Sequence, residues 1–320
     1  MPLVDMKDLL QHASRDGYAV CAFDLAGLDF LAAVTAAAEG CRAPVVLSMA
    51  EAHLDYIDGE LLAPAIEAAA RRARVPVAIQ FHRAGSVESV RRAIRLGSNC
   101  VTIAGSQRSF EENIAAVRAA ADTAHACGVP VEGGLNAILR SSSAMAFPDA
   151  ATPEMVREFV ERTGVDFLAI ADVCGNAPAR PQLHRERLAQ LRNEAGIPLT
   201  LDGNQRFSEA EHRQLIECGV AKIHHYVGLS RAAAQCLRQN IKATHRNGYL
   251  TLVKGVREAI RTEAELCLKL SGSAGRVQRH TGCAARRGAP KHRVIAGTHR
   301  GSLGRLAPQA RMAGLTHEKF

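Results

Sequence analysis

His82 and Arg83 stand at the end of the third short apolar run of this 320-residue chain. An imidazole has an unperturbed pKa near neutrality, so His82 could donate or accept a proton. A guanidinium has a planar fork of donors that matches a phosphate or a carboxylate, so Arg83 could hold an anionic group. We expect His82 to act as a general acid or base and Arg83 as an anion clamp. The alternative is a salt-bridged arginine beside a hydrogen-bonded structural histidine.

Polar residues also end most of the other apolar runs. Because successive strand residues point to opposite faces, only one of the adjacent His224 and His225 can point inward, and the other should pack against helices. The residues expected to surround one opening are Asp24, Ser48, Glu51, His82, Arg83, Ser106, Gln107, Glu132, Asp172, Cys174, Asp202, Asn204, His224, His225 and Tyr226.

Two glycine-containing segments after the last two runs have the character of a phosphate site. Residues 202–205 would let the backbone approach a ligand closely, and residues 227–230 open a predicted helix, whose N-terminal amides attract anions. The alternative is that both glycines only permit tight turns. The contacts expected for a phosphate are Gly203, Gln205, Gly228 and Ser230.

An eightfold alternation of apolar runs and helical stretches would position these side chains. The runs begin about 23 to 37 residues apart, and several are apolar throughout, as strands buried on both faces are. This pattern predicts an α/β fold, a closed TIM (β/α)8 barrel with its active site at the carboxyl ends of the strands. The predicted strands are 19–25, 44–49, 76–82, 100–105, 130–135, 167–173, 198–203 and 221–227.

The predicted helices include one before the barrel and one after it. Residues 6–14 should lie across one mouth, and residues 253–270 should form an extra C-terminal helix. Ser86, Thr152 and Ser208 are expected N-caps, because each precedes helical periodicity with acidic residues in the first turn. The crossover helices are expected at 28–40, 60–74, 87–96, 110–127, 153–163, 184–195, 209–218 and 230–245.

Composition separates the chain into two parts. Residues 276–320 carry ten Lys or Arg and one acidic residue, so residues 1–275 hold a net charge of about −1 out of the total of +8. We expect a barrel domain over 1–275 and a basic, disordered tail over 276–320, or the product of a reading-frame change. Nucleic acid would then be bound only through the tail.

The remaining composition indicates a cytoplasmic protein. No apolar run approaches the roughly 20 residues of a membrane span, and the N-terminus lacks the pattern of a signal peptide. The nine cysteines are odd in number and contain no C-x-x-C pair, which is typical of reduced thiols. We expect no membrane contact and no organic cofactor.

The stretch from residue 19 to about 244 resembles the class II, metal-dependent ketose-bisphosphate aldolases. The motifs that carry the resemblance are residues 76–94, 105–106 with 110–113, 159–166, 196–199 and 219–223. The resemblance implies a barrel that binds a divalent metal, usually zinc, through three histidines. The metal would polarise a ketose carbonyl, an aspartate would move the proton, and backbone amides after strands seven and eight would hold the phosphate. It also implies a phosphorylated or acidic sugar as ligand and a homo-oligomer.

Carried over to this chain, the resemblance places different side chains at the reacting positions. The family has H-L-D-H-G after strand three, where this chain has residues Gln80 to Ala84. The proton-transferring aspartate therefore falls on His82, and the first metal histidine falls on Arg83. Arginine does not ligate zinc, so these replacements argue against ordinary zinc-aldolase activity.

The other family positions fall after strands five to eight. The second metal histidine falls on Cys174, with the following glycine kept as Gly175, and the third falls on Asp202. Glu132 is retained, while the substrate segment N-x-x-T begins at His224. These positions add Gly175 and His224 to the expected substrate contacts.

A remodelled metal site is one interpretation of these changes. Cys174 and Asp202 are capable zinc ligands, and His82 could supply a third from a neighbouring strand. Against this, the charge of Arg83 would repel a dication and would suit an anionic ligand. Two functions stay open: a C–C lyase for a phosphorylated or acidic ketose, or a non-catalytic sugar-phosphate-binding or regulatory pseudo-aldolase.

Overall fold

Eight parallel strands close into a barrel in the order of the sequence, which confirms the predicted TIM barrel. The computed structural model describes residues 3–103, 109–134, 152–170, 185–202, 207–243 and 248–277, with the side chain of Asp202 excepted. The strands are β1 Val20–Asp24, β2 Val45–Ala50, β3 Val77–Ala84, β4 Cys100–Ile103, β5 Val131–Gly134, β6 Phe167–Ile170, β7 Leu199–Asp202 and β8 Val220–His225.

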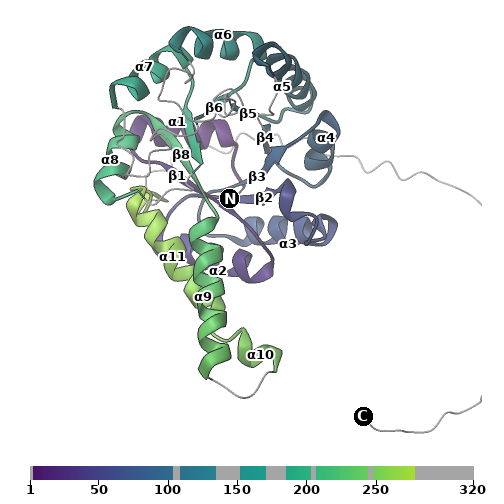
Figure 1. Ribbon diagram of the computed structural model, residues 1–320, viewed down its shortest axis with the longest axis vertical. Coiled ribbons are helices and arrows are strands. Elements are labelled where there is room, and N and C mark those ends of the chain that lie inside the picture. The colour runs from purple at the N-terminus through teal and green to yellow at the C-terminus, as the bar shows by residue number, and fades with distance from the viewer. Residues whose placement is uncertain are drawn as a thin grey trace, which may run out of the picture. The chain divides into compact units, whose positions relative to one another are not determined.

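Helices surround the strands, as Figure 1 shows. They form because apolar residues recur at helical spacing and dock on the outer face of the barrel. Their bounds are α1 Met6–Asp16, α2 Leu28–Cys41, η1 Glu51–His53, α3 Gly59–Arg72, α4 Val87–Arg95, α5 Phe110–His125, α6 Pro153–Thr163, α7 Arg185–Ala195, α8 Glu209–Glu217, α9 Val227–Ala243, α10 Tyr249–Leu252 and α11 Val256–Leu270.

The three predicted N-caps are confirmed. The side chains of Ser86, Thr152 and Ser208 each accept a hydrogen bond from the backbone N–H three residues later. At Ser208 the bond is reciprocal, since the Glu211 side chain accepts from the Ser208 amide. Local capping chemistry therefore sets where these crossover helices begin.

The C-terminal part departs from the predicted bounds. Helix α9 begins at Val227, three residues before the predicted start, and the predicted helix 253–270 is α11, which begins at Val256 and follows a short α10 that was not predicted. Gly255, with φ of 79°, lies at the N-terminus of α11, and this left-handed conformation interrupts the helical path. Helix α11 packs against α2 and α9, so it covers the barrel wall beside β1.

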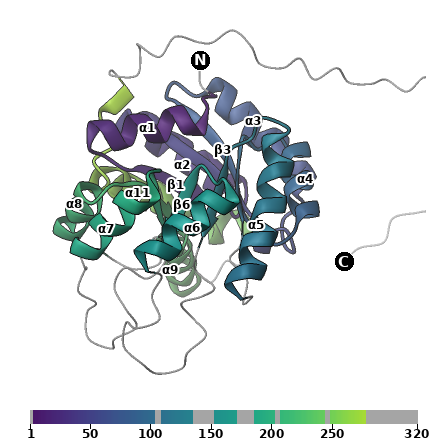
Figure 2. The same ribbon diagram turned by 90° about the horizontal axis from the view of Figure 1, so that it is seen from above.

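Helix α1 closes the amino-terminal end of the barrel (Figure 2). Its apolar side chains, among them Met6 and Leu10, are fully buried. They pack on a layer of small and apolar residues inside the barrel, made of Val20, Ala22, Val46, Ala78, Cys100, Phe167 and Ala221. This apolar floor leaves the opposite, carboxyl-terminal end for polar side chains.

Two strands contain an extra residue relative to a neighbour. Between Phe81 and Ala84, β3 shifts its register against β4, and Arg83 in that interval has φ of 61°. In β8 the register against β7 shifts at Ala221, just before Lys222. Such bulges redirect side chains, and here both Ala221 and Lys222 lie inside the barrel.

Among the described residues, no helix combines the length and the apolar composition that crossing a bilayer requires. The seven cysteines in this part of the chain are all free thiols, as their sequence pattern indicated. The residues from 278 onward, with most of the predicted tail, lie outside the described part.

Gly133 in β5 provides a test of packing between the barrel and α6. A Cβ atom at this position would lie 2.6 Å from Val165 Cγ1 and 3.3 Å from two ring carbons of Phe159. We predict that Gly133→Ala lowers the free energy of unfolding by about 1–3 kcal/mol, the usual cost of overpacking. Gly248→Ala is the control, since a Cβ there meets nothing within 4 Å. Urea denaturation followed by circular dichroism measures both, and equal stability of the two variants would contradict the prediction.

His225 makes stability depend on pH. It is buried against Phe23, and burial, followed by the charges of His212 and His224, lowers the pKa of His225 to about 3. In the unfolded chain the pKa is about 6.5, so between these values the unfolded state binds more protons and stability falls as pH falls. We predict that His225→Phe lessens this loss between about pH 6.5 and pH 3. Urea denaturation midpoints measured across that range test this prediction. Parallel curves of midpoint against pH for the wild type and the variant would refute it.

Candidate active site

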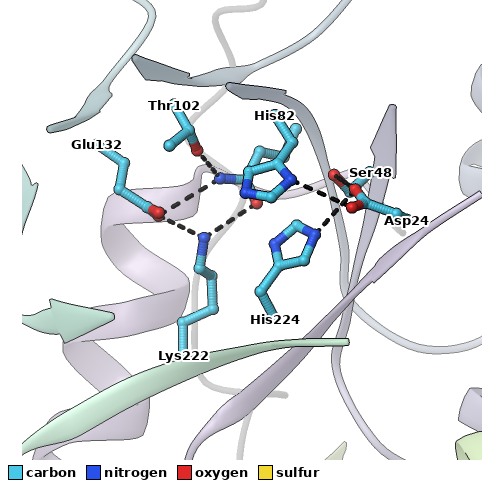
Figure 3. A network of polar contacts seen from close by, with 8 residues as sticks. Asp24, Ser48, His82, Thr102, Glu132, Lys222 and His224 are labelled. Carbon is cyan, nitrogen blue, oxygen red and sulfur yellow. Dashed lines mark hydrogen bonds and ion pairs between the residues drawn. The ribbon is translucent and has the colours of Figure 1, made fainter. Parts of the chain in front are cut away.

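An aspartate and two histidines lie together at the carboxyl ends of the barrel strands (Figure 3). Asp24 ends β1, His82 lies near the end of β3, and His224 lies near the end of β8. Each residue is only 5% exposed. Because β1 is the neighbour of β8 and lies two strands from β3, three separate parts of the sequence supply this cluster.

Asp24 is the centre of the contacts in this cluster. Ser48 Oγ donates to Asp24 Oδ1 over 2.7 Å, and His82 Nδ1 lies 3.1 Å from Asp24 Oδ2. His224 Nε2 lies 2.8 Å from Asp24 Oδ1, but the geometry of this contact does not meet that of a hydrogen bond. The rings of His82 and His224 stack with centroids 3.7 Å apart. The carboxylate thus fixes the orientation of His82 in particular.

Burial and charge oppose each other at these groups. Burial alone would raise the pKa of Asp24, but the charges of His224 and His82 and their contacts outweigh it and hold the pKa well below its ordinary value. Burial lowers the pKa of His224, and the nearby Asp24 only partly offsets this effect. Near neutral pH, Asp24 is therefore ionised and His224 is uncharged.

A second polar layer lies directly beneath the histidines. Lys222 and Glu132 form an ion pair, with exposed side-chain fractions of 0% and 2%. Lys222 Nζ also donates to Gln80 Oε1 over 3.1 Å. The Gln80 amide donates to Thr102 Oγ1 and, over 3.4 Å, to Glu132 Oε2. Four strands, β3, β4, β5 and β8, are linked through this layer.

The cluster suits a divalent metal ion in donor type and charge. Asp24, His82 and His224 each offer one ligand atom, and these atoms all lie within 4.8 Å of one another. Both ring nitrogens of His224 are buried without a hydrogen-bond partner among the described residues, so its ring can still ligate. The Asp24 carboxylate supplies a negative charge that would attract a cation. The three side chains could therefore hold a metal such as zinc.

Arg83 and Glu51, both predicted at the mouth, have distinct positions. Arg83 is an exposed residue on the β3 bulge, in contrast to the buried His82 before it. Glu51 accepts hydrogen bonds from the Gly85 amide, over 2.7 Å, and from the Ser89 hydroxyl. Glu51 thus holds the turn that follows β3.

The two residues predicted near the start of α9 are helical. Gly228 does not form a tight turn, so that alternative is wrong for it. A Cβ at Gly228 would lie 2.5 Å from Glu263 Oε1, so the glycine lets α11 pack closely on α9. The Ser230 amide donates to Tyr226 O over 2.9 Å as part of the helix.

The other predicted site residues are not placed. Asp202 ends β7, where its backbone is the register partner of His224, and its side chain lies outside the description. Cys174, Gly175, Gly203 and Gln205 lie outside the described residues.

The sequence interpretation did not assign roles to Asp24, Gln80 or Lys222. A signal existed, because polar residues two apart in a buried strand share a face, as do Gln80 with His82 and Lys222 with His224. These pairs mark two polar layers of the barrel interior. The prediction that only one of His224 and His225 faces inward is confirmed, with His224 in the cluster.

Known proteins resemble this chain over most of its length. The family model of class II fructose-bisphosphate aldolase matches residues 4–276. The uncharacterized protein YdjI of Escherichia coli K12 is 30% identical over 281 residues, which cover 86% of this chain and 100% of YdjI. A probable fructose-bisphosphate aldolase of Bacillus subtilis 168 is 33% identical over 250 residues, 76% of this chain and 88% of its own.

The solved structures agree with the sequence comparison. The crystal structure of the YdjI aldolase from Escherichia coli K12 superposes with a TM-score of 0.75 at 30% identity, covering 86% of this chain and 99% of that one. A putative fructose-1,6-bisphosphate aldolase from Coccidioides immitis also gives a TM-score of 0.75, at 25% identity and over 86% and 98% of the two chains. The chain belongs to the class II fructose-bisphosphate aldolase family.

Proposed function

We propose that this protein is a C–C lyase that cleaves a phosphorylated or acidic ketose, with Asp24, His82 and His224 as its reaction centre. The observation that supports this most is the buried carboxylate shared by two imidazoles at the end of the barrel where such enzymes react. A purely structural cluster would be costly there, because buried charges stabilise a fold poorly.

In the proposed reaction His82 moves the proton. The ionised Asp24 can only accept, so His82 would carry a hydrogen on Nδ1 and present Nε2 as the base. Nε2 would take the proton of the substrate hydroxyl beside the bond that breaks. The electrons of that bond then move onto the ketose carbonyl and form an enediolate, which is later protonated on carbon.

The same side chains would hold the metal ion that the family resemblance implies. Asp24, His82 and His224 would be its ligands, and Cys174 and Asp202 are proposed as further ligands. When bound, a divalent ion polarises a carbonyl oxygen and stabilises negative charge on it. His82 would then be a ligand, not a base, so metal content decides its role.

We propose Arg83 as the clamp for the anionic group of the substrate. Its exposed position at the end of β3 supports this. Further proposed substrate contacts are Gly175, Gly203, Gln205, Gly228 and Ser230.

The test combines metal analysis with cleavage assays on ketose 1-phosphates, ketose bisphosphates and acidic ketoses. We expect aldehyde release by the wild type, and a fall in kcat/KM of about 10²–10⁴-fold in His82→Gln, since that is the usual contribution of a positioned base. Mass spectrometry of bound metals, with and without chelator, shows whether the reaction depends on an ion. His12→Gln, on α1 at the opposite end of the barrel, is the control and should retain full activity.

The alternative function, a non-catalytic sugar-phosphate-binding protein, gives a different result. Calorimetry would then show binding of ketose phosphates without aldehyde release, in both the metal-loaded and the metal-free protein. That outcome would overturn the lyase proposal.

A further inference from the structure

We infer that the Lys222–Glu132 ion pair is a positioning device: with Gln80 and Thr102, it fixes His82 and His224 relative to each other. This inference deepens the proposed function and rests on it for the catalytic readout. Nothing in the contacts of Lys222 requires it to touch substrate, because its amine is fully buried and held by Glu132 and Gln80.

The position of the network is the first argument. Gln80 precedes His82 by two residues on β3, and Lys222 precedes His224 by two residues on β8. Each histidine therefore stands directly above a member of the network on the same inward face. The contact between Lys222 and Gln80 joins the two strands across the barrel, since β3 and β8 are not hydrogen-bonded neighbours.

The backbone irregularities are the second argument. The register of β3 against β4 shifts between Phe81 and Ala84, around His82, so a regular ladder holds His82 on the β2 side only. The register of β8 against β7 shifts at Ala221. Beside these bulges, side chains add links between strands: Gln80 bonds to Thr102 of β4, and Lys222 bonds across the barrel to Glu132 of β5.

The contribution of a buried ion pair to stability also favours a positioning role for Lys222 and Glu132. A buried ion pair is often no more stabilising than apolar side chains of similar volume, whereas removal of one partner leaves an unpaired charge and is strongly destabilising. Stability alone does not account for a lysine and a glutamate inside the barrel. Specific orientation is what hydrogen-bonded charges provide and apolar packing does not.

This difference gives a test that separates a positioning role from a structural one. We predict that the single variants Lys222→Met and Glu132→Leu lower the Tm, because each leaves one buried charge unpaired. The double variant Lys222→Met/Glu132→Leu should recover a Tm within a few degrees of the wild type. Its kcat should still fall at least tenfold, with KM within about threefold, because the substrate site is intact and the histidines are not held.

A matched control removes an ion pair elsewhere. Lys7 Nζ lies 2.7 Å from Asp166 Oδ1, linking α1 to the segment before β6. Lys7→Met should leave kcat unchanged. A double variant that folds like the wild type and keeps the wild-type kcat would overturn the inference, as would a borohydride-trapped adduct of a ketose on Lys222.

A second readout does not depend on catalysis. In ¹H–¹⁵N spectra of histidine-labelled protein, His82 and His224 should each give one tautomer in the wild type and averaged or multiple signals in the double variant. The variants His82→Gln and His224→Gln assign the signals. Absence of cleavage by the wild type would refute the proposed function alone, whereas unchanged imidazole signals in the double variant would refute the positioning role.

Discussion

The ionised carboxylate of Asp24 inside a closed barrel is the constraint on which the site depends. A buried negative charge requires hydrogen bonds or positive charge around it. Ser48 supplies a hydroxyl from the neighbouring strand, and His82 and His224 supply ring nitrogens from β3 and β8. This one group therefore orients His82 and brings together residues that are 200 positions apart in the sequence.

The two polar layers compensate their buried charges in different ways. In the lower layer, Lys222 and Glu132 neutralise each other, and Gln80 and Thr102 use the remaining donors and acceptors. In the upper layer, Asp24 contacts Ser48 and two histidines, of which His224 is uncharged near neutral pH. The upper layer can therefore interact with a proton, a metal ion or a polarised substrate, whereas the charges of the lower layer are paired with each other.

The architecture could be predicted from the sequence because its signals are local. Apolar runs such as residues 76–82 and caps such as Ser208 depend on a few neighbouring residues, and they located the strands and most helices. The start of α11 at Val256, three residues after the predicted start, was missed because the left-handed conformation at Gly255 is one of several that glycine adopts in a chain.

The site could be predicted only in part because its geometry is not local. Strand ends placed Asp24, His82 and His224 at one mouth, but their mutual contacts depend on barrel closure and on bulges at Arg83 and Ala221. A strict alternation of inward and outward residues cannot place Ala221 and Lys222 on the same side. Register shifts of this kind leave no composition signal, so the sequence did not show that Ala221 also faces the interior.

The bulge at Arg83 has a consequence for the side chain at this position. A left-handed conformation, such as that of Arg83, costs a residue with a Cβ about 1–2 kcal/mol. The hydrogen bonds that Glu51 accepts from Gly85 and Ser89, just after the bulge, help to offset this cost. Glu51 thus helps to set the shape of the segment that follows the bulge. Because the left-handed conformation is a property of the backbone here, any side chain at position 83 would start from the same exposed point at the end of β3, whatever chemical group it carries.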